Sequence, residues 1–128
     1  MNSRSLKPRA HRFAYDGLDR VIHERARLGL LTCLVAHPKG LSFGTLKHLC
    51  RLTDGNLSRH LQVLEAAKLV ETSKSHVRNR PQTLCRITLQ GRKRYVNYLA
   101  ILEQVILDAT AGIGNELENK SASALARP

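Results

Sequence analysis

The side chains best suited to chemistry lie within residues 53–62, TDGNLSRHLQ, and their types suit the recognition of DNA bases. If this segment is helical, a step of about 100° per residue places Leu57, Leu61 and Leu64 on one buried stripe. The opposite face then presents small or polar residues, namely Gly55, Ser58, Arg59 and Gln62, with Asn56 at its flank. Arginine can form two hydrogen bonds to guanine N7 and O6, and Asn or Gln can pair similarly with adenine. The pattern therefore predicts a base-reading helix face, at which Gly55 lets the backbone approach a phosphate.

Basic residues gather again in residues 70–94, which hold seven of them and a single acid, Glu71. Residues 70–77 and 83–88 follow the period of two that is typical of strands, and residues 78–81 are typical of a turn. Arginine is favoured in a narrow minor groove, where the negative potential is enhanced. We therefore expect a hairpin whose tip contacts DNA. The full set of expected DNA contacts is Thr53, Gly55, Asn56, Ser58, Arg59, Gln62, Lys74, Arg78 and Arg80.

The motifs of enzymes and metal sensors are missing. There is no glycine-rich phosphate loop, GxSxG or HExxH, and no two of the ten acids resemble an acid–base pair. Cys33, Cys50 and Cys85 stand far apart in the sequence and are expected to be small core residues. His48 and Cys50 would lie about 200° apart on a helix, too far to share one ion. We predict no catalytic residue, cofactor or metal, and we expect His60 to be a half-buried packing or phosphate-contacting residue.

Apolar periodicity and capping residues predict the elements that position these side chains. Helices are expected over residues 21–36, 41–50 and 54–68, with Ser42 and Thr53 as caps of the second and third. Thr88 caps a last helix over about residues 89–111. Two short helices split by a three-residue turn and followed by a hairpin form a winged helix-turn-helix, mainly α with a small β-hairpin (α+β). The expected domains are a flexible basic arm at 1–17, a winged-helix DNA-binding domain with a C-terminal dimerisation helix at 18–111, and a flexible tail at 112–128.

Composition agrees with a nucleic-acid partner. The 128 residues suit one domain, and a net charge of +11 with a pI near 10.3 indicates a polyanion. Aromatic residues are only 4%, which favours duplex DNA over base-stacking recognition of single strands. The longest nearly apolar run, residues 29–36, is shorter than the ~20 residues that span a bilayer. No apolar stretch follows the basic N-terminus. We expect a cytoplasmic protein without membrane contact, associated with the nucleoid when bound to DNA.

The string LTDGNLSRHL at residues 52–61, followed by Leu64-Glu65 and the basic hairpin, resembles the small winged-helix transcriptional regulators of the MarR/ArsR-like superfamily. The resemblance covers about residues 18–107. It implies a homodimer on a near-palindromic operator, with Asn56, Ser58, Arg59 and Gln62 reading bases or phosphates and Arg78 and Arg80 as wing contacts. It leaves room for a small-molecule effector of unknown chemistry. Metal-sensing relatives carry paired ligands that this chain lacks.

The last predicted helix has more apolar surface than one buried face requires. One stripe comprises Tyr95, Leu99, Leu102, Ile106 and Ala109, and a second comprises Tyr98, Ile101 and Val105, with Ile113 as a candidate extension. Either stripe can cover the core, and the other is then expected to form the dimer interface, since contiguous exposed apolar patches mark interaction sites. The alternative is that the first helix or the tail covers the second stripe within one chain.

Two function classes remain. The favoured one is a dimeric, sequence-specific regulator that binds double-stranded DNA. The other is a winged-helix module that binds protein without sequence-specific DNA binding. A recognition face of Asn, Ser, Arg and Gln favours DNA, since protein interfaces favour Tyr, Trp, Phe and Met at their centres.

Overall fold

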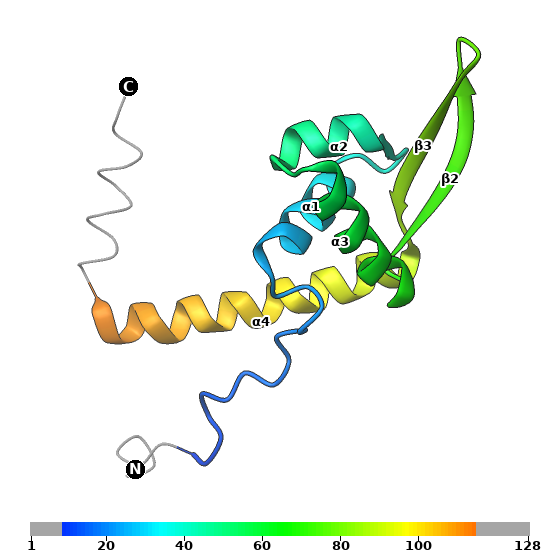
Figure 1. Cartoon of the computed structure of the whole chain (residues 1–128). Helices are drawn as coiled ribbons and strands as arrows, with labels where there is room; N and C mark the ends of the chain where they lie inside the picture. The colour runs from blue at the N-terminus through cyan, green and yellow to red at the C-terminus, as the bar shows by residue number, and fades with distance from the viewer. Residues whose placement is uncertain (1–8, 115–128) are drawn as a thin grey trace, which may run out of the picture.

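The computed structural model describes residues 9–114 and contains four helices and a three-stranded antiparallel sheet in this range (Figure 1). Along the chain the elements are α1 (Arg25–Ala36), β1 (Leu41–Ser42), α2 (Phe43–Cys50), α3 (Asp54–Ala66), β2 (Val70–Val77), β3 (Arg80–Ile87) and α4 (Leu89–Ile113). The expected tail after residue 114 and the first eight residues lie outside the described range. The predicted winged-helix architecture is confirmed.

Local capping sets the ends of the helices. Glu24 caps α1, and its carboxylate accepts a hydrogen bond from the Arg27 backbone N–H at 2.8 Å, so this helix starts four residues later than expected. Ser42, Thr53 and Thr88 cap the other three helices as predicted. At the end of α3 the Leu69 N–H bonds to the Leu64 carbonyl at 2.9 Å. This Schellman closure stops the helix at Ala66, short of the expected residue 68.

The sheet has the order β1-β3-β2, with β3 in the middle. The hairpin turn is formed by Arg78 and Asn79, which both have positive φ angles of 53° and 65°. Two such residues define a type I′ turn, whose twist matches that of the strands. The returning strand therefore begins at Arg80, directly opposite Val77, and not at residue 83. The two-residue strand β1 was not predicted, because its pairing with Leu84 and Cys85 links distant segments.

Helix α4 runs beneath the three-helix core and continues past it on the side opposite the hairpin (Figure 1). Its start packs tightly on the α3–β2 junction at Gly91. A Cβ atom at this position would lie 2.9 Å from the Leu69 carbonyl carbon and still closer to its oxygen, so only glycine fits. Farther along, the buried Tyr95 hydroxyl pairs with Thr32 and the Tyr98 hydroxyl with His23, each at 2.7 Å. These hydrogen bonds fix the direction of α4 relative to α1.

The described part of the N-terminal arm contacts the far half of α4. The Arg12 guanidinium forms an ion pair with Asp108 at 2.6 Å, and the Tyr15 hydroxyl also bonds to this carboxylate. Hydrogen bonds from these two side chains hold the pKa of Asp108 well below its usual range. Gly17 lies against Ile101. The arm therefore covers part of the second apolar stripe.

Candidate nucleic-acid interface

Helix α3 presents the expected recognition face. Its buried side comprises Leu57, His60, Leu61 and Leu64. The five residues expected to read DNA from this helix, Gly55, Asn56, Ser58, Arg59 and Gln62, are all exposed. The Arg59 guanidinium donates to the Asn56 side-chain oxygen at 3.3 Å, so the two side chains lie on one surface. This polar face has the donors and acceptors that major-groove recognition requires.

The start of α3 is held in place by its own side chains. The Thr53 hydroxyl accepts a hydrogen bond from the Asn56 N–H at 3.1 Å, which makes Thr53 a structural cap as well as an expected DNA contact. Asp54 forms an ion pair with Lys47 of α2 at 2.9 Å. The pair is exposed, so its contribution to stability is small. It neutralises the negative charge of Asp54 at the helix end that is expected to approach DNA.

His60 lies on the buried side of α3, with only 7% of its surface exposed, which favours the packing role over phosphate contact. Since a guanidinium has no acceptor, Arg27 Nη1 donates to His60 Nδ1 at 3.2 Å. Arg27 Nε in turn donates to the Val21 carbonyl at 2.6 Å. Glu24 lies 3.9 Å from the same imidazole nitrogen. This network ties the recognition helix to the start of α1, and no local pattern indicates it, because Arg27 and His60 are 33 residues apart.

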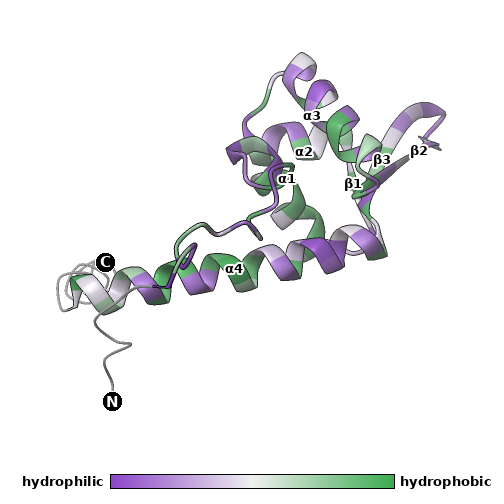
Figure 2. Ribbon diagram, turned by 90° about the horizontal axis from the view of Figure 1, so that it is seen from below, coloured by the Kyte–Doolittle hydropathy of each residue, from purple (hydrophilic) through white to green (hydrophobic). Residues whose placement is uncertain are grey.

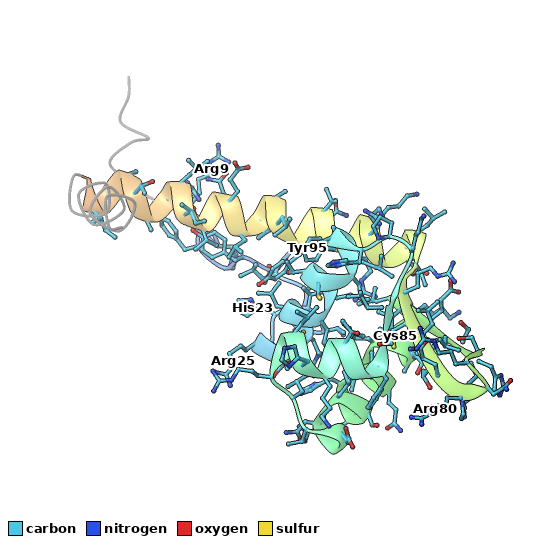
Figure 3. The ribbon with its side chains drawn as sticks, turned by 90° about the horizontal axis from the view of Figure 1, so that it is seen from above. Arg9, His23, Arg25, Arg80, Cys85 and Tyr95 are labelled. Carbon is cyan, nitrogen blue, oxygen red and sulfur yellow. The ribbon has the colours of Figure 1, made fainter. Side chains whose placement is uncertain are left out.

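The hairpin formed by β2 and β3 projects from one end of the domain and matches the expected wing. Lys74, Arg78 and Arg80 are all exposed, and Arg80 lies near the hairpin tip (Figure 3). A non-glycine residue with positive φ is uncommon, so Arg78 holds a conformation that Asn or Gly adopts more easily. Placing a cation in this position at the tip is what a phosphate or minor-groove contact requires.

One basic residue of the 70–94 cluster has a structural role instead. Arg94 Nη2 lies 2.7 Å from the Asp19 carboxylate, and Arg94 Nη1 donates to the Ala67 carbonyl at 3.3 Å. Arg94 thus links α4 to the N-terminal segment and to the end of α3, and its charge is already balanced by Asp19. The remaining positive charge of the hairpin is exposed.

The three cysteines differ from the expectation in part. Cys85 is buried in the core, but Cys33 and Cys50 are half-buried and line one cavity between α1 and α2. Burial raises the pKa of Cys50, and that of Cys85, to about 11, so both thiols are protonated at neutral pH. Within residues 9–114 no group of three or more His, Cys, Asp or Glu side chains is placed to hold a metal ion.

The two apolar stripes of α4 are placed differently from each other. Tyr98 is buried, and Ile101 and Val105 are partly covered, so most of the second stripe faces the chain's own core and arm. The first stripe begins at buried Tyr95 and then becomes accessible, with Leu99 41% and Ile106 52% exposed. Figure 2 shows hydrophobic residues, in green, recurring along the part of α4 that extends past the other helices. Both tyrosines therefore belong to the core, and only part of the first stripe is available to a partner.

Known proteins resemble this chain in both sequence and structure. Residues 26–106 match the winged helix DNA-binding domain family. An uncharacterised protein of Methanocaldococcus jannaschii is 46% identical over 57 residues, which cover 44% of this chain and 62% of that protein. The match thus spans less than two thirds of its length.

Two solved structures illustrate the likeness. The transcriptional regulator homologue from Pyrococcus horikoshii OT3 superposes with a TM-score of 0.67 and 31% identity, over 71% of this chain and 89% of that one. The S. aureus MepR–DNA complex superposes with a TM-score of 0.65 and 20% identity, over 94% of this chain and 96% of that one.

These likenesses define the class as winged-helix proteins with the MarR-like fold, in which a helix-turn-helix and a wing are joined to a long C-terminal helix. Because the family match runs from α1 into α4 and covers more than half of the chain, the chain belongs to the winged helix DNA-binding domain family. It shares this fold with the transcriptional regulator homologue from Pyrococcus horikoshii OT3.

Proposed function

We propose that the protein is a sequence-specific regulator that binds double-stranded DNA as a homodimer, with α3 in the major groove and the wing on the adjacent backbone or minor groove. The observation that supports this most is the unobstructed polar face of α3, with Arg59 and Asn56 held together at 3.3 Å. Exposed Arg78 and Arg80 at the wing supply the positive charge that non-specific affinity needs. The direct readers are Gly55, Asn56, Ser58, Arg59 and Gln62, with Thr53, Lys74, Arg78 and Arg80 beside them.

The proposed dimer uses the accessible part of the first α4 stripe, Leu99, Ile106 and Ala109, with the half-buried Leu102 between them. A two-fold axis along this half of α4 leaves the two wings at the outer ends of the dimer, since the hairpin lies at the opposite end of the domain (Figure 1). Recognition helices in such a dimer are expected to be about one DNA turn, ~34 Å, apart. The core side of this half of α4 is packed within the same chain by Tyr95, Tyr98, Ile101 and Val105.

Helix α4 also invites a different interpretation. Within residues 9–114 it is the one helix long and apolar enough, by length and composition, to cross a membrane. Its tyrosines are buried and hydrogen-bonded to α1 and to the segment before it, and the family match extends to residue 106. We therefore propose that its apolar surface meets a second copy and that the protein works in the cytoplasm, on the nucleoid when bound.

An effector site is proposed between the arm and α4, where Gly17, Asp19, Arg94, Asn97, Tyr98 and Ile101 line a cavity of about 390 Å³. Relatives of the same fold have been solved with small molecules: NadR with 4-hydroxyphenylacetate and MepR with ethidium bromide. We propose neither an enzymatic activity nor a metal for this chain, because the described residues offer no cluster of ligands and the two cysteines with the most strongly raised pKa values are protonated at neutral pH.

The experiment that tests this function is selection of bound sequences from a random duplex pool, followed by measurement of affinity for the selected site and for random duplex at several salt concentrations. A specific regulator enriches a near-palindromic motif and binds it at least ~10³-fold more tightly than random duplex. A protein-binding module enriches no motif. An Arg59→Ala variant provides the control, since it should weaken the preference at one base of each half-site while the wing retains non-specific affinity.

A further inference from the structure

Two arginines outside the recognition helix and wing line one cavity on the surface of the domain. Arg25 lies at the start of α1, and Arg51 lies in the turn between α2 and α3. Both are exposed, and both line a cavity of about 810 Å³. Among the described residues neither guanidinium has an ion pair, whereas Arg12 and Arg94 each pair with an aspartate. Two unpaired guanidinium groups at one cavity favour the binding of an anion.

The backbone of Arg51 adds a second observation. Its φ and ψ angles are both 54°, a left-handed conformation that ordinary side chains rarely adopt. The turn of a helix-turn-helix often contains glycine, and glycine would be unstrained here. Arg51 holds this conformation in the Schellman closure that ends α2, where the Leu52 N–H bonds to the Lys47 carbonyl at 3.1 Å. A glycine at this position would keep the closure without the cost of a positive φ, but it would remove a cation from the cavity that Arg25 also lines.

The remaining walls of the cavity suit a sugar–phosphate strand. Ala26 and Gly29 of α1 leave the floor open because they have little or no side chain. Leu49, 53% exposed, offers an apolar surface to a sugar ring. No Asp or Glu lines the cavity, and the Cys50 thiol within it is uncharged, since burial raises its pKa to about 11. Nothing in the cavity therefore repels a phosphate.

The position of the cavity relates it to the DNA-binding face. Figure 3 shows Arg25 and Arg80 at opposite ends of the same side of the domain, with α2 and α3 between them and α4 on the far side. The accessible half of α4 extends away from the wing (Figure 1). A second copy joined there lies on the Arg25 side. In the proposed dimer the two cavities thus face the centre of the operator, while the wings face its ends.

We propose that Arg25 and Arg51 form a phosphate-binding site for the DNA backbone between the two half-sites of the operator. The ligand is the phosphodiester strand itself, held by the two guanidinium groups of each subunit. This inference rests on the proposed function and adds to it a third DNA-binding region besides the recognition helix and the wing. Because four arginines then meet the central segment of one operator, the site also constrains the spacing between half-sites.

The test measures binding to the selected operator as a function of salt for the Arg25→Ala, Arg51→Ala and double variants. Each neutralised phosphate contributes about 0.9 to the log–log salt slope. Each single variant removes one guanidinium from each subunit and should lower the slope by about 1.8, and the double variant by about 3.6. Arg25→Lys, which keeps the charge, should retain most of the slope. Lys93→Ala is the matched control, because it removes an exposed cation on α4 that lies outside the cavity lined by Arg25 and Arg51.

The Arg51→Gly variant separates binding from folding. It should keep or raise the melting temperature, since it relieves the positive φ, and yet lower the salt slope as Arg51→Ala does. Ethylation interference then locates the phosphates that the site binds. Phosphates between the half-sites should lose their effect on binding in the double variant, while those near the wing keep theirs.

The outcomes distinguish this inference from the proposed function. If the intact protein selects no duplex motif, the proposed function itself fails. If it binds an operator but the double variant has the same salt slope as Lys93→Ala, the phosphate site is wrong. An unchanged interference pattern between the half-sites, with the change confined to the wing flanks, overturns its placement at the centre.

Discussion

Ile106→Ala should weaken the dimer strongly while leaving the monomer folded. This side chain lies on the accessible part of the first α4 stripe and is 52% exposed. Full burial of an isoleucine contributes about 1.5–3 kcal/mol, so roughly half of that is still to be gained by each copy on association. In a two-fold dimer each copy contributes one Ile106, so the free energy of burial is gained twice. The truncation should therefore cost about 1.5–3 kcal/mol, which raises the dimer Kd by about 10- to 150-fold.

Leu107→Ala is the matched control for this prediction. Leu107 is exposed to a similar degree, 55%, but it is the next residue along α4 and lies about 100° around the helix. If the first stripe is the interface, this variant should change the Kd by less than about threefold. Circular dichroism of both variants should match the intact protein, because neither side chain belongs to the core.

Sedimentation equilibrium over a range of protein concentrations measures both dissociation constants. Equal effects of the two substitutions would refute the assignment of the interface to the first stripe. A single species near the monomer mass of 14.3 kDa at ~10 μM for the intact chain would refute the dimer altogether, since specific DNA binders work far below that concentration.

The remaining predictions concern DNA binding, folding and metal. Arg59→Ala should cost about 1–3 kcal/mol of specific binding and relax the preference at one base of each half-site, and an equal decrease on random duplex would mean that Arg59 binds a phosphate. Arg78→Ala and Arg80→Ala should weaken binding to all sequences and lower the salt slope by about 1 for each phosphate that is no longer neutralised; an unchanged slope in the double variant would remove the wing from the interface. Gly91→Ala should destabilise the fold by at least about 1–3 kcal/mol in thermal unfolding, because its Cβ meets the Leu69 carbonyl, whereas Gly112→Ala, with open space around it, should not. Elemental analysis of untagged protein should find far less than one zinc per chain, and a stoichiometric amount would overturn the prediction of no metal.

The recognition helix could be predicted almost residue by residue. Its leucines recur at spacings of four and three, Thr53 caps it, and the polar face follows from helical geometry alone. The strand β2 was also predicted with its observed bounds, since alternation along a strand is a local signal. These features depend on residues a few positions apart, so they are readable without the fold.

The hairpin turn and the first helix show where local reasoning was less accurate. The expected turn extended to Pro81, but the type I′ geometry needs only Arg78 and Asn79, so β3 starts three residues early. The first helix was expected from Val21, but the Glu24 side chain caps the helix at that point. In both cases the first residue of the element is set by one side chain or by one pair of φ angles. Hydrophobic periodicity does not define that residue.

The sequence by itself determined the order of the helices and the hairpin, the polar face of the third helix and the basic wing. Periodicity, capping and charge are properties of residues that lie close together in the sequence. Only the tertiary structure decided which stripe of α4 stays accessible, and that Cys33 lines one cavity with Cys50, as Arg25 does with Arg51. These pairs are 17 and 26 residues apart and lie on different elements. Their proximity follows from how helices pack against each other, since the packing geometry depends on the whole set of contacting side chains and not on any local pattern.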